Sequence, residues 1–215
     1  AAPLVVASVG MTPALAVIDL NSDGKLDLLA GGDGGRLHVL LGLGDGKTQP
    51  PVSYNLGGST SWLVVGQFDG DGKLDVMTGS SGWSSTGMAF GLALGNGDGT
   101  FGAARGIPSV RGASTAATGD LDGDGKLDLI TGTSGYGVQV LPGNGAAAFQ
   151  DGQLIPTGGS GSAAMATADF HGDSKPDVAT IYGRIQFVTS FPDFKVKVVD
   201  SFADLHVQVG ESFPD

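Results

Sequence analysis

The chain of 215 residues contains no cysteine. That absence excludes disulfide bonds, zinc–thiolate sites and a thiol nucleophile. The sequence also lacks any run of about 18 apolar residues, so no segment is expected to span a membrane. Lysine and arginine together number 11 and form no cluster. Because nucleic-acid binding needs grouped basic side chains to neutralise phosphates, nucleic acid is not an expected partner.

Groups that could build a catalytic site are sparse. The only histidines are His38, His171 and His206, which lie far apart in the sequence, and no serine lies in a nucleophile-elbow motif. Catalysis requires an acid, a base and usually a nucleophile that converge on one point. We therefore expect that the protein is not an enzyme.

Glycine, in contrast, is abundant, with 39 residues and no three-residue period. Each glycine costs roughly 1 kcal/mol relative to alanine inside a helix, so a helical protein is disfavoured. Apolar residues make up 40% of the chain and charged residues 15%, as in a folded globular protein. These values predict an all-β fold rich in turns.

An acidic loop of nine residues occurs four times, each time between two apolar runs. The copies are loop one (19–27), loop two (67–75), loop three (120–128) and loop four (169–177). Oxygen-bearing side chains recur at loop positions 1, 3, 5 and 9, and glycine stands at position 6 in the first three copies. Calcium takes six to eight oxygen ligands, and the backbone carbonyl at position 7 can add one more. Most of the 22 acidic residues lie in these loops, so the net charge of −11 is largely ligand charge.

The candidate metal ligands follow from this spacing, with the position-7 lysines contributing only their carbonyl groups and directing their side chains outward. They are Asp19, Asn21, Asp23, Lys25 and Asp27; Gln67, Asp69, Asp71, Lys73 and Asp75; Asp120, Asp122, Asp124, Lys126 and Asp128; and Asp169, His171, Asp173, Lys175 and Asp177. Position 12 never holds the glutamate of an EF-hand. The alternative is that these Asp/Gly-rich turns simply cap hairpins.

The four loops are not equivalent as calcium sites. Gln67 replaces the first carboxylate of loop two with an uncharged amide, which weakens that site. In loop four His171 occupies position 3 and Ser174 replaces the glycine, and imidazole is a poor ligand for a hard cation. We expect three to four bound Ca²⁺ ions.

The loops recur with a period of about 50 residues, which indicates a propeller or solenoid. In each repeat one apolar strand enters the loop, a second leaves it and a third alternating strand follows, before a glycine-rich hairpin. A fourth strand completes the first three units. The repeats lie at about 14–58, 61–110, 114–158 and 162–190. This pattern predicts a β-propeller of about four four-stranded blades with one calcium loop per blade.

The loops of the form D-x-D-x-D-G-x-x-D, together with Leu94-Gly-Asn-Gly-Asp-Gly-Thr-Phe101, resemble the FG-GAP/VCBS repeats of integrin-like β-propellers. The resemblance implies one blade per repeat, with calcium in the turn between its first two strands. Propellers of this family are commonly seven-bladed, whereas four units are present here. The ring is therefore either small and closed or completed by another chain. Residues 1–10 resemble a fourth strand and are expected to complete the last blade, so that the propeller occupies residues 1–190.

The C-terminal segment 184–215 contains three copies of an 11-residue repeat. Each copy is an alternating strand followed by Ser-Phe-(Pro/Ala)-Asp, and the segment resembles septoil-knot domains. It supplies either extra strands on the last blade or a docking strand for a neighbouring subunit, since strand addition to a sheet edge is a common mode of association.

These observations predict a calcium-stabilised module for adhesion or self-assembly, whose partners are other extracellular proteins or copies of itself. Calcium loops in extracellular modules bind at roughly 0.1–1 mM, which favours a secreted or cell-surface location. The alternative is a calcium-dependent lectin that binds glycans through Trp83 and Tyr136, which lie in Gly/Ser-rich turns. Trp62, in an apolar run, is expected to pack between blades.

Overall fold

The structure is a computed structural model. It describes residues 14–57, 60–79, 90–107, 113–133, 137–156, 164–170, 175–181, 185–189 and 197–199. Within these ranges the chain forms β-strands joined by turns, with a single short 3-10 turn, η1 (Asp33–Gly35). The predicted all-β fold is confirmed.

Sixteen strands of the described residues form four antiparallel sheets, here called units one to four. Unit one contains β1 (Leu15–Ile18), β2 (Asp27–Gly32), β3 (Arg36–Leu40) and β4 (Val52–Asn55). Unit two contains β5 (Trp62–Gly66), β6 (Asp75–Gly79), β7 (Phe90–Ala93) and β8 (Arg105–Gly106). Unit three contains β9 (Ala113–Gly119), β10 (Asp128–Thr133), β11 (Gly137–Leu141) and β12 (Gln153–Ile155). Unit four contains β13 (Ala164–Ala168), β14 (Asp177–Ile181), β15 (Ile185–Thr189) and β16 (Lys197–Val199).

Each sheet keeps its strands in chain order, with every strand paired to the next. This meander follows from the turn-rich sequence, because short connections join antiparallel neighbours. The sequence offered residues 1–10 as the strand that completes the last repeat, and the C-terminal segment as a source of extra strands on the same blade. The position beside β15 is occupied by β16 from the C-terminal segment, so this strand comes from the second of the two candidates. The alternating Lys195-Val-Lys-Val-Val199 run favours strand pairing, and residues 1–10 themselves lie outside the described residues.

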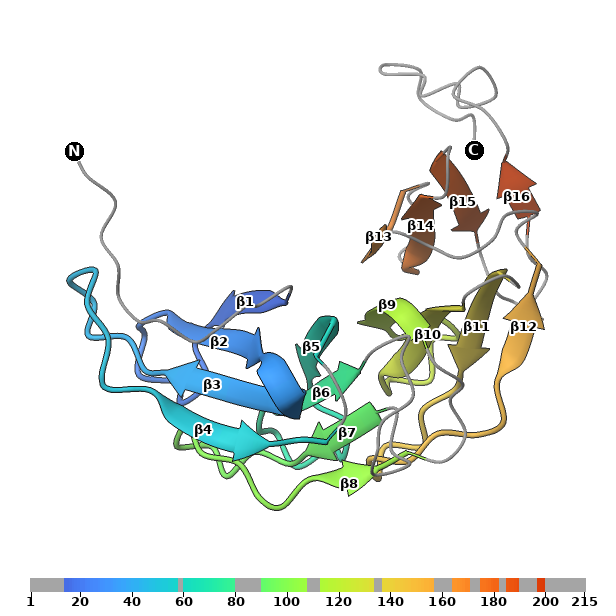
Figure 1. The fold of residues 1–215 in the computed structure, drawn as a ribbon. Coiled ribbons are helices and arrows are strands. Elements are labelled where there is room, and N and C mark those ends of the chain that lie inside the picture. Colours follow the sequence, from blue (N-terminus) through green and yellow to red (C-terminus); the bar gives the residue numbers. More distant parts are fainter. Residues whose placement is uncertain are drawn as a thin grey trace, which may run out of the picture.

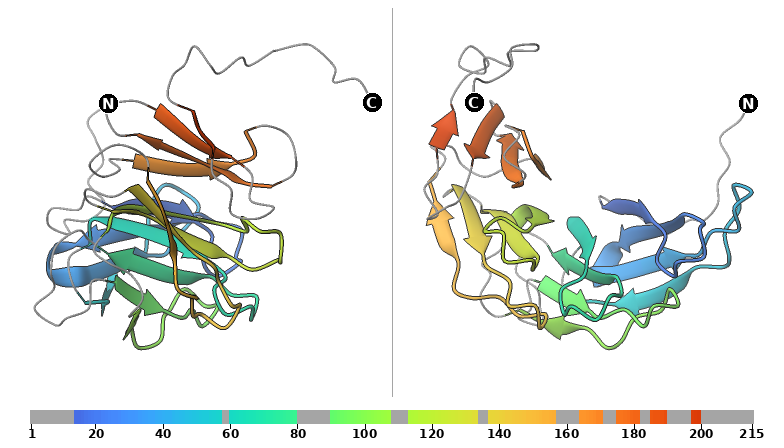
Figure 2. Two further views of the ribbon diagram at one scale, coloured as in Figure 1. Left: turned by 90° about the vertical axis from the view of Figure 1, so that its right-hand side faces the viewer. Right: turned by 180° about the vertical axis from the view of Figure 1, so that it is seen from behind.

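The four sheets lie side by side in an arc (Figure 1). The first strands of successive units, β1, β5, β9 and β13, contact one another along the arc. The two further views show the same arrangement, with units one and four at opposite ends (Figure 2). Over the part of the chain that the structure describes, the arc is open.

The hydrophobic core is divided among the three junctions between units. Leu29 and Leu37 of unit one pack with Val76 of unit two. Side chains of units two and three form a second cluster, and Ile130 packs with Val178 at the third junction. The core therefore holds neighbouring sheets together face to face.

Trp62 lies at the junction of units two and three, as the sequence predicted. Its ring is buried against Phe90, with a centroid separation of 5.2 Å. Its indole N–H donates a 3.0 Å hydrogen bond to the carbonyl of Ala113 in the next unit. The hydrogen bond satisfies the one polar group that a buried tryptophan carries.

Candidate metal centres

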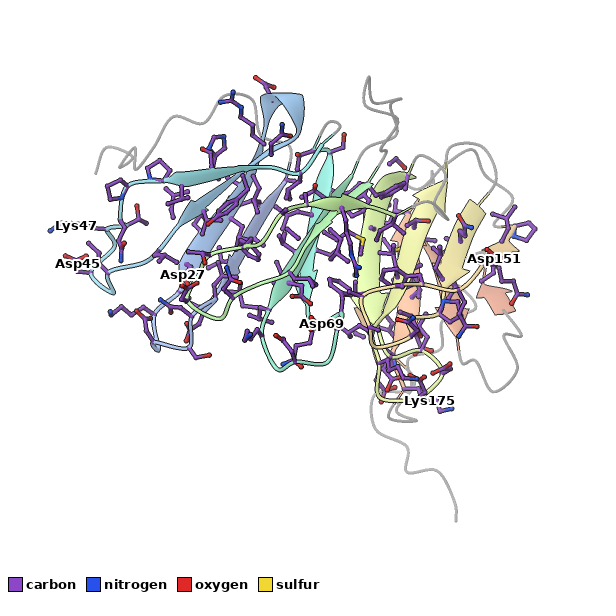
Figure 3. The ribbon with its side chains drawn as sticks, turned by 90° about the horizontal axis from the view of Figure 1, so that it is seen from below. Asp27, Asp45, Lys47, Asp69, Asp151 and Lys175 are labelled. Atoms are coloured by element: carbon purple, nitrogen blue, oxygen red, sulfur yellow. The ribbon has the colours of Figure 1, made fainter. Side chains whose placement is uncertain are left out.

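The acidic loops connect the first and second strands of each unit, from β1–β2 to β13–β14. Because all four units run in the same order, the loops lie at the same edge of the sheets. Asp27, Asp69 and Lys175, from loops one, two and four, lie along this side (Figure 3). The described strands place the loops where the sequence predicted them.

The backbone of the first three loops turns left-handed at two places. Glycine at position 6 has a positive φ, with values of 81° for Gly24, 87° for Gly72 and 82° for Gly125. Position 4 is also left-handed, at 75° for Gly70. In loop one this position holds Ser22, with φ 57°, a conformation that costs an L-residue roughly 1–2 kcal/mol. The spacing of the oxygen-bearing residues indicated no role for position 4.

Replacing Ser22 with glycine is therefore expected to stabilise the protein by about 1 kcal/mol, because glycine adopts a positive φ without the Cβ clash. Thermal unfolding of Ser22→Gly measures the change as a higher midpoint. The reciprocal variant Gly123→Ser serves as the control and should lower the midpoint. A lower midpoint for Ser22→Gly would show that its hydroxyl outweighs the backbone strain.

Loop three brings three carboxylates together. One oxygen from each of Asp120, Asp122 and Asp124 lies within 4.8 Å of the others. The N–H groups of Gly123 and Gly125 donate to the two oxygens of Asp120 at 2.8 and 2.9 Å. These bonds orient the carboxylate from inside the loop. Three hard oxygen donors held in this way fit a hard divalent cation such as Ca²⁺.

Loop one repeats this hydrogen bonding. The N–H of Gly24 donates to Asp19 at 2.9 Å, and the N–H of Asp23 lies 3.1 Å from an oxygen of both Asp19 and Asn21. Asn21 supplies an amide oxygen where loop three has a carboxylate. In loop two the N–H of Asp71 donates to Asp69 at 3.1 Å, and Gln67 stands where the other loops carry Asp19 or Asp120.

In loops one to three the lysine at position 7 turns back over its own loop. Its ammonium group pairs with the carboxylate at position 5, at 3.1 Å for Lys25–Asp23 and 2.9 Å for Lys73–Asp71. In loop three the hydrogen bond from Lys126 lowers the pKa of Asp124. The prediction that these side chains point outward omitted this ion pair. A bound cation would compete with the ammonium group for the position-5 carboxylate.

In units one to three the stem of this lysine crosses a glycine of the hairpin that follows the third strand. A Cβ atom at Gly44 would lie 3.2 Å from Cδ of Lys25, and one at Gly97 would lie 3.1 Å from Cδ of Lys73. Both glycines also have a positive φ, of 83° and 84°. The hairpin glycines thus make room for the lysine that belongs to the acidic loop.

In loops one to three the aspartate at position 9 is buried and bonded to the backbone at both oxygens. Asp128 accepts the N–H of Leu121 at 2.9 Å and the N–H of Gly143 at 2.8 Å. Asp27 and Asp75 do the same in units one and two, through Leu20 with Gly42 and Phe68 with Gly95. In loop four Asp177 accepts the N–H of Phe170 at 2.9 Å. Each of the first three carboxylates therefore ties its loop to the distant hairpin.

Burial raises the pKa of Asp75 and Asp128, while the N–H donors act in the opposite direction. Both carboxylates are thus buried and already hydrogen-bonded to the backbone. The sequence predicted position 9 as a calcium ligand, and that role stays a prediction. The backbone bonds are a second role, which the loop spacing did not indicate.

Several predicted site residues lie outside the described residues. They are His171 and Asp173 of loop four, together with the candidate glycan-stacking residues Trp83 and Tyr136. Asp169, Lys175 and Asp177 are described and flank the gap in loop four. The fourth calcium site and the lectin hypothesis therefore stay predictions. Within the described ranges no helix is long and apolar enough to cross a membrane.

Comparison with solved structures shows similarity to larger proteins. A lectin of Agrocybe aegerita that recognises non-reducing terminal N-acetylglucosamine has a TM-score of 0.59 and 20% identity, covering 87% of this chain and 52% of that one. BBS1N, in complex with ARL6DN, has a TM-score of 0.54 and 13% identity, covering 88% and 55%. The Tc holotoxin pore of Photorhabdus luminescens has a TM-score of 0.52 and 15% identity, covering 79% and 8%. The chain spans about half the length of the first two, and these similarities concern the fold alone.

Comparison with curated proteins finds no match. The profile of the 7(1) septoil knot domain matches residues 178–215. The profile of the FG-GAP-like repeat matches residues 19–78, 82–131 and 120–180, which together make up most of the chain. Both matches agree with the resemblances drawn from the loops and the C-terminal copies. The chain belongs to the FG-GAP-like repeat family.

Proposed function

We propose that the protein is a calcium-stabilised extracellular β-propeller module that serves adhesion or self-assembly. The observation that carries this proposal is the recurrence of one acidic loop at the same place in successive sheets, with three carboxylates gathered within 4.8 Å in loop three. An ion at each loop would hold the first hairpin of its sheet. Three to four Ca²⁺ ions would be bound, one per loop.

Charge explains why the loops would need a cation. Asp120, Asp122 and Asp124 bring three negative charges to one turn, where the ammonium group of Lys126 pairs with Asp124. Like charges at this separation repel, and an opposite charge relieves the repulsion. Calcium supplies a divalent positive charge and accepts the carboxylate oxygens directly.

The fold supports a scaffolding role. Four antiparallel meanders side by side are the arrangement of propeller blades, and FG-GAP-like repeats are typical of extracellular proteins. The rigid sheets would present turns and sheet edges to a partner. We assign binding and assembly, and no reaction, to these turns and edges.

Calcium is expected to raise the melting temperature of the protein by several degrees. Ligand that binds only the folded state stabilises it by RT ln(1+[Ca]/Kd), about 0.4–1.4 kcal/mol per site at about 1–10 times Kd. For a chain of this size 1 kcal/mol corresponds to about 2–4 °C. Calorimetry in millimolar calcium and in excess chelator measures the shift, with magnesium as the control ion. The variant Asp120→Asn/Asp122→Asn should lose part of it, and equal melting temperatures in calcium and chelator would disprove structural calcium.

A further inference from the structure

The three internal junctions are built from the same two loop positions. The side chain at position 8 packs backward onto the preceding unit. Leu127 lies against Gly66 at the end of β5, and Pro176 lies against Gly119 at the end of β9, where a Cβ atom would be 3.4 Å from Cβ of Pro176. Leu74 packs into the cluster shared with unit one.

The side chain at position 2 packs forward onto the next unit. Phe68 of loop two contacts Phe149 of unit three edge to face, with ring centroids 6.0 Å apart. Its carbonyl also accepts the N–H of Ala147 at 2.7 Å. Leu20 is buried in the cluster that units one and two share, and Leu121 is buried in the cluster that units three and four share. Each internal junction therefore contains the position-2 side chain of one loop and the position-8 side chain of the next loop.

Unit one carries this backward surface with nothing of the described chain packed on it. Leu26, at position 8, is 67% exposed, whereas Leu74, Leu127 and Pro176 at the same position are half-buried. Leu15 and Val17 of β1 are 63% and 57% exposed, while their counterparts Leu63 and Val65 pack into the junction of units one and two. We call Leu15, Val17 and Leu26 the leading face.

Unit four carries the matching forward surface at the other end. Phe170, at position 2, is 49% exposed, whereas the residues at this position in loops one to three are 4%, 3% and 0% exposed. Ala166 and Ala168 on β13 and Ile181 on β14 are also exposed. We call these four residues the trailing face. The two faces lie at opposite ends of the open arc (Figure 2).

We infer that the leading face of one chain binds the trailing face of a second copy, in a fourth junction of the internal kind. The inference rests on the proposed assembly function and names its partner and its surface. The two faces are the separated halves of an interface that this chain forms three times within itself, so they fit each other. Such a head-to-tail contact is heterologous and closes into a ring when the rotation allows. Two copies give eight sheets, at the upper end of the range of about 4–8 blades for propellers.

Cysteine cross-linking tests the contact directly, because the chain has no cysteine of its own. Leu26 and Ala168 of two copies would occupy the places that Pro176 and Gly119 occupy at the internal junction. The variant Leu26→Cys/Ala168→Cys is expected to form disulfides between copies under mild oxidation in calcium. Gly119→Cys/Pro176→Cys is the reference and should cross-link within one chain, since the Cβ separation there is close to the ~3.8 Å typical of disulfides. Absence of intermolecular product from the first variant, with the reference cross-linked, would overturn the inference.

Sedimentation velocity of the unmodified chain gives the second readout. We expect a dimer, which becomes monomeric in Leu26→Asp and in Phe170→Asp. Leu154→Asp is the matched control, because Leu154 is an exposed leucine on β12, outside both faces, and this variant should remain dimeric. An unmodified chain that is monomeric at every concentration would refute the contact. If the calcium-dependent melting shift persists in that monomer, the structural role of calcium survives and only the head-to-tail contact fails.

Discussion

Asp128→Ala is expected to lower the free energy of unfolding by about 2–6 kcal/mol, in chelator as well as in calcium. The buried carboxylate accepts two backbone N–H groups, from Leu121 and Gly143. Alanine would leave both donors buried without an acceptor, and each such donor costs about 1–3 kcal/mol. Urea denaturation in chelator isolates this cost from any contribution of calcium.

Asp122→Ala is the matched control within the same loop. Asp122 accepts the exposed N–H of Asp124, at 3.0 Å, and water can replace this acceptor when the side chain is removed. This variant should change stability little in chelator and lose stability in calcium. If Asp128→Ala were instead neutral in chelator and destabilising only in calcium, position 9 would be a metal ligand and not a backbone tie.

Gly95→Ala is expected to destabilise the protein by about 2–4 kcal/mol. A Cβ atom at Gly95 would overlap the carbonyl oxygen of Leu74, and a backbone atom cannot rotate away as a flexible side chain can. The N–H of Gly95 also donates to Asp75 at 2.9 Å, and this hydrogen bond holds the hairpin to the acidic loop. The overlap would therefore strain the hairpin and lengthen that bond. Chemical denaturation gives the difference in unfolding free energy.

Gly102→Ala controls for the loss of glycine itself. A Cβ atom at Gly102 would make only an ordinary 3.6 Å contact with the carbonyl of Leu94. Its substitution should change stability by no more than about 0.5 kcal/mol. Equal effects of the two substitutions would mean that the close approach at Gly95 does not limit the hairpin.

Sequence reasoning located the local features of the fold. The apolar run that enters loop one predicted Leu15–Ile18 as a strand, and the structure has β1 with these bounds. Glycine at position 6 predicted a sharp turn, and Gly72 has φ 87°. Both properties depend on residues that are close in the chain, so the local sequence pattern predicts them.

The contacts that hold the sites together were not predictable in the same way. Asp75 bonds to Gly95, twenty residues away, and nothing in the nine-residue loop indicates that partner. The Lys25 stem over Gly44 is another such contact. The pairing of β15 with β16 was only one of the alternatives that the sequence left open, because residues 1–10 and the C-terminal copies both resemble strands that fit one sheet edge.

The division of each junction between two loop positions has a consequence for how the gene can change. A duplicated segment of about 50 residues brings a forward side chain and a backward side chain with it. If it were inserted between units two and three, for example, Phe68 would pack against it from one side and Leu127 from the other. These contacts would be of the same kind as that between Phe68 and Phe149. The length of the array can then vary by unequal recombination without a new interface arising. Selection on the number of units would act on the geometry of the whole assembly, while each junction stays as it is.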